Sequence, residues 1–325
     1  MSKSDPIEQA LDRIADLRHA TETDSIVDEL RQFLRSLSNL VVAKAAKLTG
    51  ELNLKTLVPD LLAVFDKLMT GAPKLDKKCI ATTEINTALY QLDFDDPAPF
   101  LRGIRHFQLE ASFGPPVDAA AKLRGISAQA LLRTRYPDAL HQVLPLLLDP
   151  EPSARIGAVR ALATNGGEAG VLLLKLKVLS GDPEPEVTSE CFVGLLAAVP
   201  EKSVTFVGQY IDSNDSAIAE AAVLALGESR QPSAFQLLKE KWSRTVEDTA
   251  RKVLLIAMAS SRLEEAIALL ISIVSESSTR TAVDAIEALS PYRTSERVRE
   301  AVADAVSRRD EPVLRKAFAQ HLPAQ

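Results

Sequence analysis

Residues 149–162 read Asp149-Pro-Glu-Pro-Ser-Ala-Arg-Ile-Gly-Ala-Val-Arg-Ala-Leu162, a turn-forming segment followed directly by a stretch rich in small residues. Asp can cap the first amides of a helix, and Pro suits the first helical turn, so the segment predicts a turn that leads into a helix. Small side chains allow a neighbouring helix to approach closely. The stretch therefore predicts one helix of a tightly stacked helical pair.

The same pattern recurs through the second half of the chain at a nearly constant interval. The central small residue of each copy serves as a register mark, and by subtraction the marks are separated by 33, 31, 31, 32 and 32 residues; they are Ala158, Cys191, Ala222, Val253, Ala285 and Ala317. One step upstream, Arg124 corresponds to Arg155 and Leu131 to Leu162, at a spacing of 31. Such a period indicates stacked helical units that share one continuous core.

These residues resemble the HEAT-repeat family, and in particular its short bacterial branch of PBS-lyase HEAT-like repeats. The resemblance covers roughly residues 115–321, and residues 149–162 are close to the consensus of that family. It implies an all-α fold, namely an α-solenoid of about nine HEAT-like helical pairs with an N-terminal helical cap. The resemblance specifies architecture and hardly constrains function.

The N-terminal third is less regular. Two amphipathic helices are expected in residues 5–37, and a second helix of a pair in residues 39–50. Further pairs are expected at 54–69 with 75–92, and at 97–111 with 116–133, the latter divided by Phe113-Gly-Pro-Pro116. We therefore expect a helical cap over residues 1–38. A repeat solenoid should cover residues 39–325, with irregular repeats to about residue 135 and regular repeats of 31–33 residues after it.

Composition narrows the classes of function. Hydrophobic residues make up 46% of the chain and charged residues 25%, which is typical of a folded soluble protein. The net charge is −6, whereas a protein that binds nucleic acid usually carries a basic surplus, so a nucleic-acid partner is not expected. Cys79 and Cys191 lie far apart, which argues against a disulfide framework or a zinc site.

The sequence shows no secretory signal at its start and no apolar run long enough to span a membrane, so a cytoplasmic protein is expected. A search for nucleotide-binding, nucleophile-elbow and metalloprotease motifs finds none. The four histidines, which are His19, His106, His141 and His321, never share a helix at ligand spacing. We therefore expect no cofactor and no metal, and the chain is predicted not to be an enzyme.

One basic cluster is the candidate partner-binding site. Arg102, Arg105 and His106 follow one another at helical spacing, opposite an apolar face made by Phe100, Leu101, Ile104 and Phe107. Lys122 and Arg124 follow in the next helix, and Arg155 comes one repeat later. These six residues could form a basic stripe for an acidic peptide, a phosphate or another subunit. The alternative is that they pair with carboxylates such as Glu110, Asp118 and Glu151 and join neighbouring repeats.

The leading hypothesis for function is a non-catalytic interaction scaffold that presents a concave helical surface to a protein partner. The sequence identifies neither the partner nor the oligomeric state. The alternative is a HEAT-like lyase or a DNA-glycosylase-type enzyme on the same scaffold. A glycosylase would need a positively charged concave face, which the acidic composition disfavours.

Overall fold

The computed structural model describes residues 6–19, 23–71 and 74–323 of the 325-residue chain. In this part of the chain the secondary structure is helical apart from one pair of two-residue strands. The chain divides into two compact units, residues 1–173 and 174–325, and the division falls inside α10 (Gly167–Ser180). No helix of the described residues combines the length and apolar character needed to cross a membrane.

The first unit contains nine α-helices before α10, three short 3-10 helices and the strand pair. Its α-helices are α1 (Pro6–Leu17), α2 (Thr23–Leu34), α3 (Asn39–Glu51), α4 (Val58–Gly71), α5 (Ile80–Gln91), α6 (Ala98–Ile104), α7 (Ala121–Arg133), α8 (Ala139–Val143) and α9 (Pro152–Asn165). The 3-10 helices are η1 (Lys55–Leu57), η2 (Lys77–Cys79) and η3 (Leu144–Leu148). Strands β1 (Leu109–Glu110) and β2 (Val117–Asp118) pair antiparallel, with Leu109 opposite Asp118.

The second unit continues the helical pattern after α10. Its helices are α11 (Pro185–Ala198), α12 (Pro200–Gly208), α13 (Ser216–Glu228), α14 (Pro232–Arg244), α15 (Asp248–Ser260), α16 (Glu264–Glu276), α17 (Thr279–Ala288), α18 (Glu296–Arg309) and α19 (Pro312–His321), with the 3-10 helix η4 (Ser290–Tyr292) after α17. In sequence order, α2 to α19 make nine consecutive pairs after α1 in the described chain. The predicted all-α repeat architecture is confirmed.

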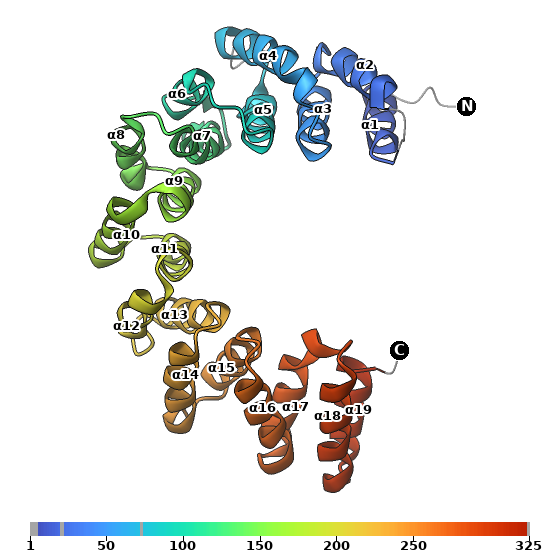
Figure 1. The fold of residues 1–325 in the computed structure, drawn as a ribbon, viewed down its shortest axis with the longest axis vertical. Helices are drawn as coiled ribbons and strands as arrows, with labels where there is room; N and C mark the ends of the chain where they lie inside the picture. The colour runs from blue at the N-terminus through green and yellow to red at the C-terminus, as the bar shows by residue number, and fades with distance from the viewer. Residues whose placement is uncertain (1–5, 20–22, 72–73, 324–325) are drawn as a thin grey trace. The chain divides into compact units, whose positions relative to one another are not determined.

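Within each unit the helices form two layers (Figure 1). The odd-numbered helices pack side by side, α1 to α9 in the first unit and α11 to α19 in the second, and the even-numbered helices form the other layer. The core lies where the two layers meet. The register marks Ala158, Cys191, Ala222 and Ala285 are fully buried, so the predicted burial of these small residues is confirmed.

Turn residues start the helices as the sequence predicts. The Asp215 carboxylate accepts the amide of Ala217 at 2.9 Å, and the Ser278 hydroxyl accepts that of Thr281 at 3.3 Å. Several helices place a proline in their first turn, where its missing N–H costs nothing. Local capping therefore explains where these helices begin.

Two local predictions are wrong. Val253 is half-exposed, and the buried side chains of that repeat are Leu254 and Leu255, so the register mark is off by one. The helix predicted over 97–111 ends at Ile104, and the helix predicted from Pro116 begins only at Ala121. Residues between them form the strand pair, because the Asp118 carboxylate takes the amides of Gln108 and Ala120, each at 3.0 Å.

The predicted cap falls on α1 and α2, and its role as a cap stays a prediction. Residues 1–5 and 20–22 of the cap lie outside the described residues, as do Ala72 and Pro73 of the turn expected after residue 69. Thr70 and Gly71, which were expected in that turn, belong to α4, and Lys74 is the one described turn residue outside it.

Replacing Ala222 by leucine should lower the free energy of unfolding by roughly 1–3 kcal/mol, because Ala222 is fully buried in α13 and the added methylenes would overpack the odd-numbered layer. Urea denaturation followed by circular dichroism measures the loss. Ala217, which is exposed in the first turn of the same helix, provides the control, and its replacement by leucine should change little. Equal stability of the two variants would contradict the packing described for Ala222.

Candidate functional site

Arg124 is the centre of a buried polar junction in the first unit. Its side chain has no exposed surface, and its guanidinium lies 2.5 Å from the Asp118 carboxylate and 2.8 Å from that of Asp149. It also donates to the carbonyl oxygen of His106 at 3.0 Å, and the ring of Phe107 lies 4.1 Å away. Because Asp118 precedes α7 and Asp149 precedes α9, Arg124 ties two successive repeats together.

The electrostatic balance at this junction favours the charged forms. Burial raises the pKa of Asp118, but the amides of Gln108 and Ala120 and the guanidinium of Arg124 outweigh it, so the pKa lies below its ordinary value of 3.8. For Arg124, burial lowers the pKa, and the two carboxylates raise it beyond that loss. The junction is therefore a fully charged buried network that fixes the base of the strand pair.

A second set of contacts ties the strand pair to the start of α5. Gln108, which is buried, donates to the carbonyl oxygen of Asp76 at 2.9 Å and to the carboxylate of Glu110 at 2.7 Å. Glu110 in turn accepts the amide of Lys78 at 2.6 Å. Lys78 and Cys79 both have left-handed backbone conformations, with φ of 62° and 49°. Such conformations cost energy in non-glycine residues, so the surrounding contacts hold this loop in a set shape.

These contacts border a groove of about 550 Å³ beside the strand pair. Its walls come from the start of α5, both strands and the first turns of α7 and α9, and its charged lining residues are Lys78, Glu84, Glu110, Asp118, Lys122 and Glu151. Burial raises the pKa of the Cys79 thiol to about 12, so this residue is a buried apolar contact and not a nucleophile. The described residues contain no group of three His, Cys, Asp or Glu side chains placed to hold a metal ion.

The segment that borders the groove carries exposed apolar side chains, of which Val117 lines the groove itself. On the segment from Phe107 to Val117, Leu109 is 68% exposed, Phe113 is fully exposed and Val117 is 51% exposed. Phe107 is 60% exposed and does not join the apolar face of α6, although the sequence pattern placed it there. We call this surface, made by Phe107, Leu109, Phe113 and Val117, the apolar rim.

The structure separates the six residues of the predicted site. Arg102 lies on α6 and pairs with Asp66 of α4. Arg105 directly follows α6 and donates to Gln142 of α8 at 2.8 Å. His106 follows the end of α6, and its Nε2 is a buried atom with no hydrogen-bond partner among the described residues. Of the six predicted site residues, only Lys122 lines the groove.

The remaining two predicted residues are buried. Arg124 forms the junction already described, and Arg155, which is 5% exposed, donates to the carbonyl oxygens of Asp149 at 2.8 Å and Pro150 at 2.9 Å. For Arg124 the geometry matches the alternative in which arginines join neighbouring repeats, whereas these two contacts of Arg155 lie in the turn before its own helix. The sequence did not predict the apolar rim, because a two-residue strand has no pattern that distinguishes it from the end of a helix.

No protein-family model and no curated protein matches the chain. Among solved structures, an engineered protein shares 17% identity at a TM-score of 0.35, with 99% of this chain and 95% of the other covered. The CpcE–CpcF complex of phycocyanin lyase from Nostoc sp. PCC7120 shares 14% identity at a TM-score of 0.38, covering 86% and 94%. Human deoxyhypusine hydroxylase in complex with glycerol shares 17% at 0.31, covering 79% and 91%.

These similarities concern the fold alone and assign no function to the chain. They do correct one expectation. The prediction that the chain is not an enzyme excluded catalysis, and that exclusion is wrong. Two of the similar structures carry the names of enzymes, a lyase and a hydroxylase. Helical repeats can carry catalytic residues spread over several units, so the absence of a short motif does not exclude catalysis on this architecture.

Proposed function

We propose that the chain is a protein-binding repeat of the HEAT-like class, and that its partner docks on the groove and apolar rim of the first unit. The observation that carries this proposal is the exposure of Leu109, Phe113 and Val117 on a segment whose base is fixed by buried polar contacts. Leu109 and Val117 lie on opposite faces of the strand pair, because Leu109 pairs with Asp118 and Val117 with Glu110. Exposed apolar side chains gathered on one short segment favour an interaction role, and aromatic residues often dominate binding energy. A fixed base lowers the ordering cost of binding.

Charge adds a second feature to the proposed surface. Lys122 has no ion-pair partner among the described residues, and Arg105 contacts the neutral Gln142, so both keep an uncompensated positive charge. Arg102, by contrast, is neutralised by Asp66. Because four carboxylates also line the groove, namely Glu84, Glu110, Asp118 and Glu151, we infer that an acidic group of the partner would meet Lys122 and Arg105 and not the groove as a whole.

A photo-crosslinking amino acid at position 113 tests the docking surface. The expected result is a discrete crosslinked protein when the variant is expressed in its host, because Phe113 projects from the apolar rim. Position 246 is the control, since Val246 is 85% exposed but lies in the second unit. Identical crosslinks from both positions, or none from 113, would contradict the proposal.

Changing Arg105 and Lys122 together to alanine should weaken capture of that crosslinked partner, and most strongly at low ionic strength, where charge attraction is least screened. The melting temperature should fall by no more than about 2–4 °C, because exposed charges contribute little to stability. Arg102→Ala is the control and should leave capture unchanged. A salt-independent loss of capture would argue against an electrostatic role for Arg105 and Lys122.

A further inference from the structure

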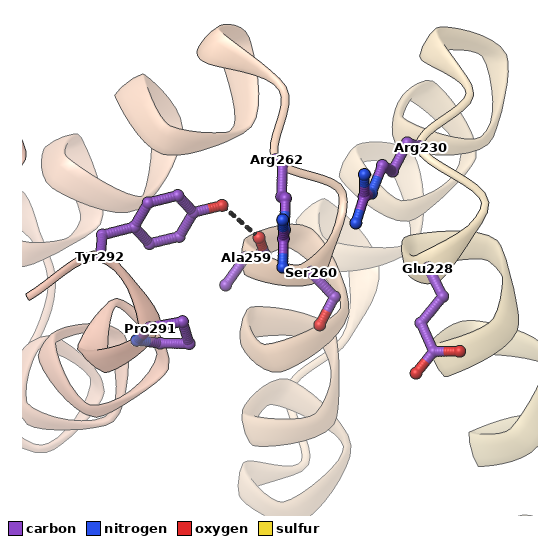
Figure 2. Close-up of a pocket in the computed structure, with 7 residues that line it drawn as sticks. All are labelled: Glu228, Arg230, Ala259, Ser260, Arg262, Pro291 and Tyr292. Carbon is purple, nitrogen blue, oxygen red and sulfur yellow. Dashed lines mark hydrogen bonds between the residues drawn. The ribbon is translucent and has the colours of Figure 1, made fainter. Parts of the chain in front are cut away.

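A second pocket lies wholly within the second unit, at the C-terminal ends of successive odd-numbered helices (Figure 2). Its volume is about 570 Å³. Arg230 follows α13 and Arg262 follows α15, and both guanidinium groups extend into the space between these helices, with Tyr292 of η4 on the far side of Arg262. The two arginines are 32 residues apart, so they occupy the same position in consecutive repeats.

The backbone at both arginines is left-handed, with φ of 54° in each case. Helices usually end in this conformation at glycine, because a side chain there costs about 1 kcal/mol. A glycine would therefore serve the turn better. The arginines at this position in two consecutive repeats place two guanidinium groups at neighbouring helix ends.

Neither guanidinium has a hydrogen bond or an ion pair with any other described residue. Elsewhere, arginines that stabilise helix ends make such contacts, as Arg309 does with the carbonyl oxygens of Val274 at 2.9 Å and Ser277 at 2.6 Å. Glu228 also lines the pocket, but its carboxylate points away from both guanidinium groups in Figure 2. Arg230 and Arg262 are therefore two neighbouring positive charges that no ion pair with a described residue neutralises.

Of the polar side chains near the two arginines, some already donate hydrogen bonds to backbone carbonyls and others line the pocket. The Tyr292 hydroxyl donates to the carbonyl oxygen of Ala259 at 2.5 Å, and the Ser261 hydroxyl to that of Met258 at 2.6 Å. Burial raises the pKa of Tyr292, and the positive charges of Arg262 and Arg230 act against this rise. Ser260 lines the same pocket and brings a further hydroxyl donor.

We propose that this pocket binds a phosphate group through Arg230 and Arg262. A phosphate dianion neutralises both arginines, whereas a single carboxylate neutralises only one, and guanidinium groups match phosphate oxygens in paired hydrogen bonds. Helix C-termini carry partial negative charge that disfavours an anion, so binding depends on the two side chains and not on the backbone. The site is independent of the protein-docking surface proposed for the first unit.

Phosphorus NMR titration of the full chain with phenyl phosphate and with inorganic phosphate tests the proposal. We expect saturable binding that weakens by roughly ten-fold or more in the Arg230→Gln, Arg262→Gln double variant, because charge-assisted hydrogen bonds are lost. Tighter binding of phenyl phosphate would identify a phosphate ester as the ligand, and equal binding would identify free phosphate. Either result supports the proposal.

Arg135 provides a matched control, since it is also an exposed arginine with a left-handed backbone, at φ of 57°, but lies in the first unit. The Arg135→Gln variant should bind phosphate with the same affinity as the unchanged chain. Arg262→Lys keeps the charge and should retain part of the affinity, and circular dichroism checks that each variant is folded. Equal affinity in the double variant and the unchanged chain, or binding of acetate as tight as that of phosphate, would overturn the proposal.

Discussion

Replacing Arg124 by leucine is expected to lower the free energy of unfolding by about 3–5 kcal/mol, because it removes one partner of a buried ion network and leaves the others uncompensated. Asp118 and Asp149 would remain buried with side-chain exposures of only 9% and 3%. The carbonyl oxygen of His106 would also lose its donor. Urea denaturation followed by circular dichroism measures the effect, and hydrogen exchange should place the loss at α7, α9 and the strand pair.

The same helix offers the control. Arg133 of α7 pairs with Asp93, which is 71% exposed, so Arg133→Leu should cost no more than about 1 kcal/mol. Similar losses for the two variants would contradict the structural role assigned to Arg124.

At acid pH the free energies of unfolding of the Arg124→Leu variant and the unchanged chain should differ less than at neutral pH. The pKa of Asp118 is lowered in the folded state, so its contribution to stability is complete above the ordinary value of 3.8 and is lost as the pH falls through the folded value. The unchanged chain should therefore lose stability in that range. The amides of Gln108 and Ala120 lower the pKa of Asp118 most and remain in the variant, but the variant lacks the further lowering by Arg124. Its free energy of unfolding should therefore fall less over this pH range.

The repeat could be predicted because its signal is local and periodic. An Asp or Ser at a turn captures nearby amides, as Asp215 does, and a small residue at a fixed interval marks the closest approach of helices, as Ala222 does. Register failed where the local pattern was ambiguous. Val253, Leu254 and Leu255 follow one another, and three consecutive apolar residues do not show which of them faces the core.

The candidate groove could not be predicted, because distant contacts create it. Gln108 contacts the loop before α5, and Asp118 contacts Arg124 in α7, and these partners override the helical pattern of residues 97–111. The burial of Arg124 did leave a signal. Arg124 and Arg155 share one position of the repeat, and an arginine held at a fixed position among small apolar residues is placed to join neighbouring units.

Replacing Gly157 by alanine should lower the free energy of unfolding by about 3 kcal/mol, at the upper end of the range for overpacked cores. A β-carbon at Gly157 would lie 2.1 Å from the Cα atom of Gly125 and 2.8 Å from its carbonyl carbon, so α7 and α9 would have to move apart. Both contacts are backbone atoms, and no change of rotamer relieves them. Arg124 directly precedes Gly125, so its ion pair with Asp149 at 2.8 Å should be disturbed as well.

The Gly208→Ala variant in α12 is the control, because it replaces a helical glycine without a clash against backbone atoms. A β-carbon there would meet only the end of the Leu237 side chain, at 2.8 Å, which can rotate away. Alanine is favoured over glycine in helices by about 0.5–1 kcal/mol, so Gly208→Ala should be neutral or stabilising.

The single tryptophan, Trp242, lies in the second unit, so its fluorescence during urea denaturation reports on that unit while circular dichroism reports on both. For Gly157→Ala, an early loss of circular dichroism before the change in fluorescence would locate the damage in the first unit, whereas unchanged stability would show that α7 and α9 are not in the close contact described.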